Sequence, residues 1–309
     1  ERRRSRRKCF FFLKPSQTNE PNYDIVHVSI KIFALLSLFI ASEASLLSTA
    51  FGDNMVLAAH PQSCALYGKT SSPKVIVTVS RDGGAETATT TSDENGRWEV
   101  RLSPVAASTS EKHTITVAAK SDPTVSLGGV LFGDVFFCSG QSNMAFPLKG
   151  VDNAGVEITK AAQYANLRLA SVEPNGEDYP LDETKTPTPW IIPDTKAVAS
   201  FSAVCIIFGE RIHDALGGKV PIGLIASAVG GTIAESWTPR QYVDACPCDQ
   251  QSSWGWNQTQ LYNAMVHPYV RMRIKSWLWY QGESNSDNFV RSEERCVGKE
   301  CRSRWSANH

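Results

Sequence analysis

Three apolar segments, each followed at once by small or polar residues, constrain the fold of this chain most. The segments and the residues that follow them are 130–138 with Ser142, 219–226 with Gly230–Gly231, and 274–280 with Gln281–Asn285. A helical apolar period runs from Val204 to Leu216, and Gly217-Gly218 supplies its stop signal. Alternating strands and helices predict an α/β fold with a mostly parallel sheet, and such sheets bind ligands at the carboxyl ends of their strands.

The segment before these strands has a different pattern. Residues 45–128 contain short runs rich in β-branched residues, separated by turn sequences such as Asp93-Glu94-Asn95-Gly96. Trp98, Val100 and Leu102 alternate with charged residues, which is the period of a half-buried strand. We expect a small β-sandwich here. Residues 146–200, which are polar and proline-rich, predict a long irregular excursion within the following domain.

The two ends of the chain differ from its middle. Residues 1–44 combine a basic cluster with an apolar run at 32–41, and Met55 is the first methionine. The run is too short to span a bilayer and has the length of a signal-peptide core, with cleavage expected after Ala44. We therefore expect a leader and a secreted or lysosomal protein. Residues 291–309 lack any apolar period and resemble translated adapter sequence, so we interpret them as a non-native tail.

Charge and cysteine content narrow the function further. The chain has 31 basic and 31 acidic side chains, so no net charge favours nucleic acid or an anionic membrane. We expect Cys138, within an apolar strand, to be a buried free thiol, and Cys246 or Cys248 to be half of a disulfide. Asn257 begins a glycosylation signature, which agrees with secretion. We expect no metal or other cofactor, and nothing in the sequence indicates an oligomeric state.

Ser142 is the candidate nucleophile. It follows an apolar strand, as a serine presented at a sheet edge would, although Met144 stands where the nucleophile elbow has its second glycine. Three donors could stabilise a developing oxyanion: the N–H of Ser142, a backbone N–H exposed in the Gly230-Gly231 pair, and the side-chain amide of Asn285. This combination indicates acyl transfer.

Long ordered motifs carry a family resemblance. They span residues 133–144, 221–232, 261–268 and 279–285, with weaker support from Met55-Val56-Leu57 and 96–100. They resemble the sialate O-acetylesterases of the SGNH hydrolase superfamily. The resemblance implies an SGNH-type three-layer α/β/α domain at 129–290, incomplete in this chain, and a serine esterase that removes O-acetyl groups from sialic acids.

The resemblance also implies roles for particular residues. Ser142 matches the family's nucleophile, and Gly231 and Asn285 match its oxyanion residues. The neighbouring candidates for the substrate pocket are Gln141, Asn143, Gly230, Gln281, Glu283 and His267. The family's general base is a histidine near the C-terminus with an aspartate shortly before it, and none of the six histidines here matches it. Since an unassisted serine is a weak nucleophile, we expect this chain as written to have little or no activity.

Three alternatives remain. The same chemistry could act on other acetylated polysaccharides. The protein could instead be a non-catalytic carbohydrate-binding protein, with exposed aromatic residues stacking on sugars, although we expect Trp277 and Trp279 to lie in the core. A glycosidase pair of Glu235 and Glu283 is the third interpretation, and the sequence does not fix their separation.

Overall fold

The computed structural model describes residues 45–245 and 255–286. Within these residues, nine strands form one mixed sheet in the order β4-β3-β6-β7-β10-β8-β9, with β1 and β11 also paired to β7, while β2 and β5 form a separate pair. The strands are β1 (Val56–Ala58), β2 (Ala65–Lys69), β3 (Ile76–Arg81), β4 (Glu86–Thr91), β5 (Arg97–Arg101), β6 (His113–Ala119), β7 (Asp122–Gly140), β8 (Leu167–Ser171), β9 (Trp190–Ile191), β10 (Ile222–Ala228) and β11 (Ser276–Tyr280).

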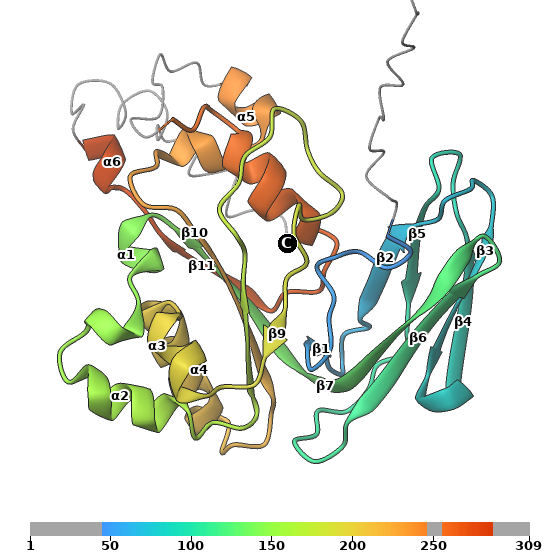
Figure 1. Cartoon of the computed structure of the whole chain (residues 1–309), viewed down its shortest axis with the longest axis horizontal. Helices are drawn as coiled ribbons and strands as arrows, with labels where there is room; N and C mark the ends of the chain where they lie inside the picture. The colour runs from blue at the N-terminus through green and yellow to red at the C-terminus, as the bar shows by residue number, and fades with distance from the viewer. Residues whose placement is uncertain (1–44, 246–254, 287–309) are drawn as a thin grey trace, which may run out of the picture. The chain divides into compact units, whose positions relative to one another are not determined.

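Short helices connect the strands of the second half (Figure 1). The α-helices are α1 (Ser142–Ala145), α2 (Ala154–Ala161), α3 (Thr195–Ser200), α4 (Ala203–Ala215), α5 (Arg240–Ala245) and α6 (Glu283–Ser286). Four short 3₁₀-helices of the described residues are η1 (Asp82–Gly84), η2 (Leu148–Gly150), η3 (Ala234–Trp237) and η5 (His267–Tyr269). The element η4 (Tyr262–Val266) is a π-helix. No described helix is long and apolar enough to cross a membrane.

β7 is the longest of the described strands, and its two halves pair with their neighbours in opposite senses. From residue 122 to 130 it pairs antiparallel with β6. From residue 131 onward it pairs parallel with β1, β10 and β11. Gly129, with φ of 68°, lies between the two halves, and a Cβ there would meet the side chain of Asn54 at 2.6 Å. The expected domain boundary after residue 128 therefore falls inside one continuous strand.

The second half has helical elements on both faces of its sheet, which confirms the α/β prediction. Along β7, Phe136 and Cys138 pack in one core with residues of α4, whereas Val135 and Phe137 pack in another with Met265 of η4 and with η5. Alternate residues of a strand point to opposite faces, so β7 contributes to both cores. Figure 1 shows α2, α3 and α4 gathered on one side of these strands.

Three sequence expectations are corrected. Residues 146–200 are not irregular throughout, because they include α2, the inner strand β8 and α3. The α4 helix is confirmed, but its buried face holds Cys205, Ile206 and Gly209, while Val204 is 37% exposed. Trp277 and Trp279 are not core residues: they are 45% and 50% exposed, because β11 pairs with β7 on one side and packs only partly on Phe137 and Trp237.

Cys138 forms a disulfide with Cys205, so the expectation of a free thiol was wrong. The bond joins β7 to α4 across 67 residues of sequence. The sequence places both cysteines in apolar surroundings, but it does not show that a strand and a helix so far apart lie in contact. Cys64 is the free cysteine of the described residues, and burial raises the pKa of its thiol to about 12. Cys246, Cys248 and the leader lie outside the described residues.

The Cys138–Cys205 bond is expected to stabilise the fold by about 2–4 kcal/mol, because it closes a long loop in the unfolded chain. Urea unfolding with and without dithiothreitol measures this. The wild-type chain and a Cys64→Ala control should both lose stability on reduction, whereas a Cys138→Ala/Cys205→Ala double variant should not respond. Equal stability of the wild-type chain in both conditions would contradict the prediction.

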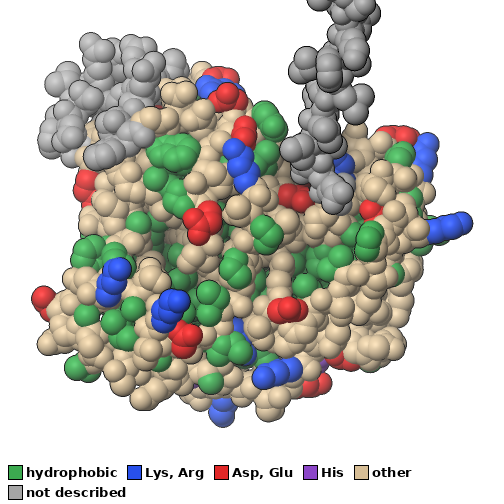
Figure 2. Space-filling view, in the orientation of Figure 1, with side chains coloured by type: hydrophobic (Ala, Val, Ile, Leu, Met, Phe, Trp, Pro, Cys, Tyr) green, Lys and Arg blue, Asp and Glu red, His purple; other side chains and the backbone are tan. Residues whose placement is uncertain are grey.

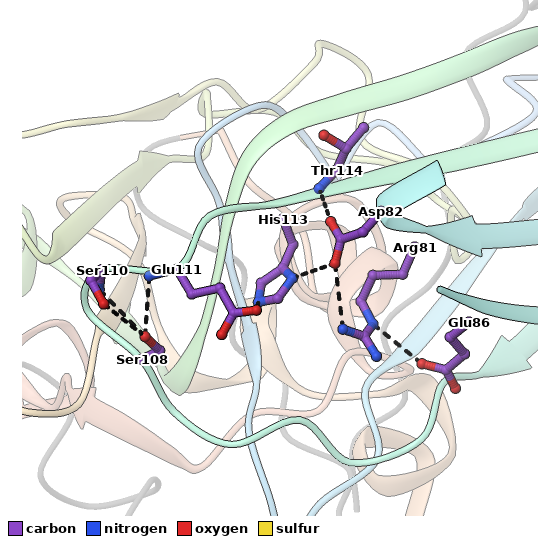
Figure 3. A network of polar contacts seen from close by, with 8 residues as sticks. All are labelled: Arg81, Asp82, Glu86, Ser108, Ser110, Glu111, His113 and Thr114. Atoms are coloured by element: carbon purple, nitrogen blue, oxygen red, sulfur yellow. Dashed lines mark hydrogen bonds and ion pairs between the residues drawn. The ribbon is translucent and has the colours of Figure 1, made fainter. Parts of the chain in front are cut away.

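A charged network ties the β3–β4 turn to β6 (Figure 3). His113 is buried, and its Nδ1 lies 2.7 Å from Oδ2 of Asp82, whose other oxygen accepts the Thr114 N–H. Arg81 contacts both Asp82 and Glu86, and Glu111 lies 3.9 Å from Nε2 of His113. Burial opposes ionisation of Asp82, but these hydrogen bonds and the Arg81 charge outweigh it and hold the pKa of Asp82 below its usual value.

Asp82→Asn should therefore destabilise the protein at neutral pH and much less in acid. A carboxylate with a depressed folded pKa contributes stability above its unfolded pKa of about 3.9, and loses it as pH falls through the folded value. Asparagine tolerates the left-handed conformation at this position, where φ is 51°, so the backbone is matched. Urea unfolding of Asp82→Asn and wild type at pH 7 and pH 3 measures this loss of stability. The prediction would be refuted if the difference in unfolding free energy between the two proteins were the same at both pH values.

Candidate functional site

The loops after β7, β10 and β11 leave the sheet at one edge. Gly140, the last residue of β7, is in register with both Ala228 of β10 and Tyr280 of β11. Gly140 approaches β11 so closely that a Cβ on it would lie 2.0 Å from the backbone carbonyl oxygen of Tyr280. Gly140 also has a φ of 144°. The strand register therefore places the ends of these three strands, and the start of the loop that follows each, side by side.

Ser142 lies on the short turn α1, and its side chain is exposed. The residues around it are held firmly. Gln141 is 3% exposed, and its Nε2 lies 3.5 Å from the Ser142 hydroxyl. The Gln141 oxygen accepts from Nε2 of Gln281 at 3.2 Å and from the N–H of Ser284 at 3.1 Å. The buried Met144 anchors the far end of α1. The result is an exposed hydroxyl on a fixed backbone.

The glycine loop after β10 lies against Ser142. A Cβ on Gly230 would be 3.5 Å from the Ser142 Cβ, so the two backbones are neighbours. Gly231 has φ of 71°, the left-handed conformation that glycine adopts without strain. Thr232 closes the loop: its hydroxyl donates to the Val229 carbonyl at 2.8 Å and accepts from Nε1 of Trp237 at 2.9 Å. The loop therefore holds its glycine backbone close to the serine.

Asn285 joins this cluster through its side chain. Its Oδ1 accepts from the Ala234 N–H at 2.9 Å and from Nε2 of Gln281 at 2.5 Å, and its Nδ2 donates to Oε2 of Glu235 at 2.9 Å. Glu235 is 5% exposed, and the sequence interpretation had considered it only as half of a glycosidase pair. The position of Glu235, four residues after Gly231, is the one signal in the sequence that could have suggested that it belongs to this site. Glu283, the other half of that pair, accepts a hydrogen bond from Asn143.

Other candidates lie elsewhere. Nδ1 of His267 lies 2.7 Å from the Leu181 carbonyl oxygen, and its ring contacts Tyr262, so its neighbours are not those of Ser142. Asn257 is exposed. Among residues 45–245 and 255–286, no histidine hydrogen-bonds the Ser142 hydroxyl, and no group of His, Cys, Asp or Glu there could hold a metal ion. Acidic and basic side chains are interspersed on the face drawn in Figure 2.

Comparisons with known proteins agree with this geometry. The family model described as carbohydrate esterase, sialic acid-specific acetylesterase, matches residues 132–294, which include all three loops. The chain belongs to this family of carbohydrate esterases.

Individual relatives carry more particular names. The sialate O-acetylesterases of Pongo abelii and Homo sapiens are each 34% identical over 251 residues, which cover 75% of this chain and 47% of each relative. The chain thus spans about half the length of these curated relatives. A solved structure, of a carbohydrate acetylesterase from Xanthomonas citri, aligns with a TM-score of 0.68 and 29% identity, over 79% of this chain and 52% of that one.

Gly140→Ala should disrupt the site, whereas Gly230→Ala should be tolerated by the fold. The Cβ at residue 140 would overlap the Tyr280 oxygen and strain the backbone, which should cost about 3 kcal/mol or more. The Cβ at residue 230 meets Ser142 at ordinary contact distance. Thermal unfolding of the two variants compares these effects, and similar losses in both would contradict the prediction.

Proposed function

We propose that this chain carries the nucleophile and the oxyanion donors of an esterase that removes O-acetyl groups from sialic acids. The observation that supports this most is the meeting of Ser142, Gly231 and Asn285 at one sheet edge, in a chain of the carbohydrate esterase family. The named substrate is that of the relatives, which are called sialate O-acetylesterases.

In this proposal Oγ of Ser142 attacks the acetyl carbonyl carbon. The new C–O bond forms as the carbonyl π electrons move to oxygen, and the N–H groups of Ser142 and Gly231, with the Asn285 amide, receive the negative charge. The sugar oxygen then leaves as an alcohol after gaining a proton, and water cleaves the acetyl-serine to release acetate. Gln141, Asn143, Gly230, Gln281 and Glu283 surround the reacting groups, and His267 supports the fold through Leu181.

The chemistry also needs a base that takes the Ser142 proton. No described histidine contacts that hydroxyl, so we propose that the 309-residue chain alone turns over slowly. A secretory location is part of the proposal. It is supported by the Cys138–Cys205 disulfide, which suits an oxidising compartment, and by the exposed Asn257 in its glycosylation signature.

Turnover tests the proposal directly. Acetate release from 9-O-acetyl-N-acetylneuraminic acid would be measured for this chain and for a chimera to which a C-terminal segment of the Homo sapiens relative is joined. The chimera should release acetate, and Ser142→Ala should reduce its kcat by more than about 10⁴-fold. The chain alone should stay near background.

Acetyl-xylan serves as the comparison substrate. Faster release from acetyl-xylan than from the sialic acid would replace the proposed substrate with an acetylated polysaccharide. Saturable sugar binding without acetate release, in the chimera as well as in the chain alone, would replace the esterase with a carbohydrate-binding protein. Ordinary enzymatic rates from the 309-residue chain would show that a base is already within reach of Ser142.

A further inference from the structure

The side-chain amide of Asn285 lies between groups of fixed polarity. On the oxygen side is the Ala234 backbone N–H at 2.9 Å, which can only donate. On the nitrogen side is the Glu235 carboxylate at 2.9 Å, which as an ion can only accept. Gln281 adds a second donor to the oxygen side at 2.5 Å.

These contacts determine which way the amide faces. An asparagine side chain ordinarily exchanges its oxygen and nitrogen by a half-turn at small cost, because either atom finds a partner. Here the half-turn would place the Asn285 oxygen against the Glu235 carboxylate and its NH₂ group against the Ala234 N–H. Both contacts would become repulsive, so one orientation is strongly preferred.

We propose that Glu235 is a positioning residue: by accepting one N–H of the Asn285 side-chain amide, it directs the second N–H toward the oxyanion. This rests on the proposed function, in which Asn285 is an oxyanion donor. The two hydrogens of the NH₂ group share one plane, so fixing one of them on Glu235 also fixes the direction of the other. A donor that is aimed before the reaction stabilises the transition state without reorganising.

Glu235 is itself well supported. It lies in η3, where its backbone carbonyl accepts from the Thr259 N–H at 2.9 Å. Trp237 of the same turn holds Thr232 of the glycine loop through a 2.9 Å hydrogen bond. Gly231 and the residue that orients Asn285 therefore belong to one short segment. The two oxyanion elements contributed by separate strands are aligned through this segment.

The carboxylate acts by orientation and not by charge. A negative group near a developing oxyanion repels it, so a purely electrostatic role would make Glu235→Gln faster than wild type. Glutamine keeps an oxygen that can accept from Asn285, but its own NH₂ group can also face Asn285 and permit the reversed amide. An orienting role therefore makes Glu235→Gln intermediate between wild type and Glu235→Ala.

Hydrogen exchange of the Asn285 side-chain amide tests the contact without turnover. The NH₂ signals of the 309-residue chain are assigned by their loss in Asn285→Asp. Exchange should accelerate about 10- to 100-fold in Glu235→Ala, the effect of losing one charge-assisted hydrogen bond, and less in Glu235→Gln. Glu210→Gln is the matched control, because it neutralises another buried carboxylate, which contacts Lys160, and should leave these signals unchanged.

Turnover of the chimera then tests the consequence. Glu235→Ala should lower kcat about 10²-fold with little change in KM, and should have no further effect in an Asn285→Ala background. Unchanged Asn285 exchange in both folded Glu235 variants would overturn the proposal, as would additive effects of the two substitutions on kcat. A chimera without activity would refute the proposed function, and in that event the exchange result still decides whether Glu235 orients Asn285.

Discussion

The pairing of β7 determines most of this structure. One strand of 19 residues serves first as an antiparallel partner for β6 and then as a parallel partner for β1, β10 and β11. The residue before β10 approaches β7 closely at Gly133, where a Cβ would lie 2.0 Å from the Pro221 carbonyl oxygen. Because the strand ends at Gly140, its register also decides where Ser142 emerges.

The elements that the sequence predicted well are those with strong local signals. β10, β11 and α4 follow long apolar patterns bounded by glycine or polar residues, and each lies close to its predicted range. β8 was missed because it is short, carries Arg168 and is buried at four successive positions, so it does not alternate. The exposure of Trp277 and Trp279 was missed because a pattern of alternation does not report what covers each face.

The candidate site likewise has features that could be predicted from the sequence and features that could not. Ser142, Gly231 and Asn285 could be placed together because strand ends in a parallel sheet share an edge. The hydrogen bond between Asn285 and Glu235 could not be predicted from the sequence, since it joins residues 50 positions apart and depends on side-chain direction. The same holds for Gln141, which connects the β7 and β11 loops across 140 positions. Such contacts follow from the folded geometry and not from any local pattern.

The Cys138–Cys205 bond has a consequence for how the chain withstands proteolysis. The bond closes a covalent ring that contains Ser142, α2, β8 and the proline-rich stretch before β9. A protease that cuts one exposed peptide bond inside this ring opens it but separates nothing, since both fragments stay joined through sulfur. The nicked protein would remain one covalent molecule until it is reduced, and the serine would remain tethered to the strand that presents it.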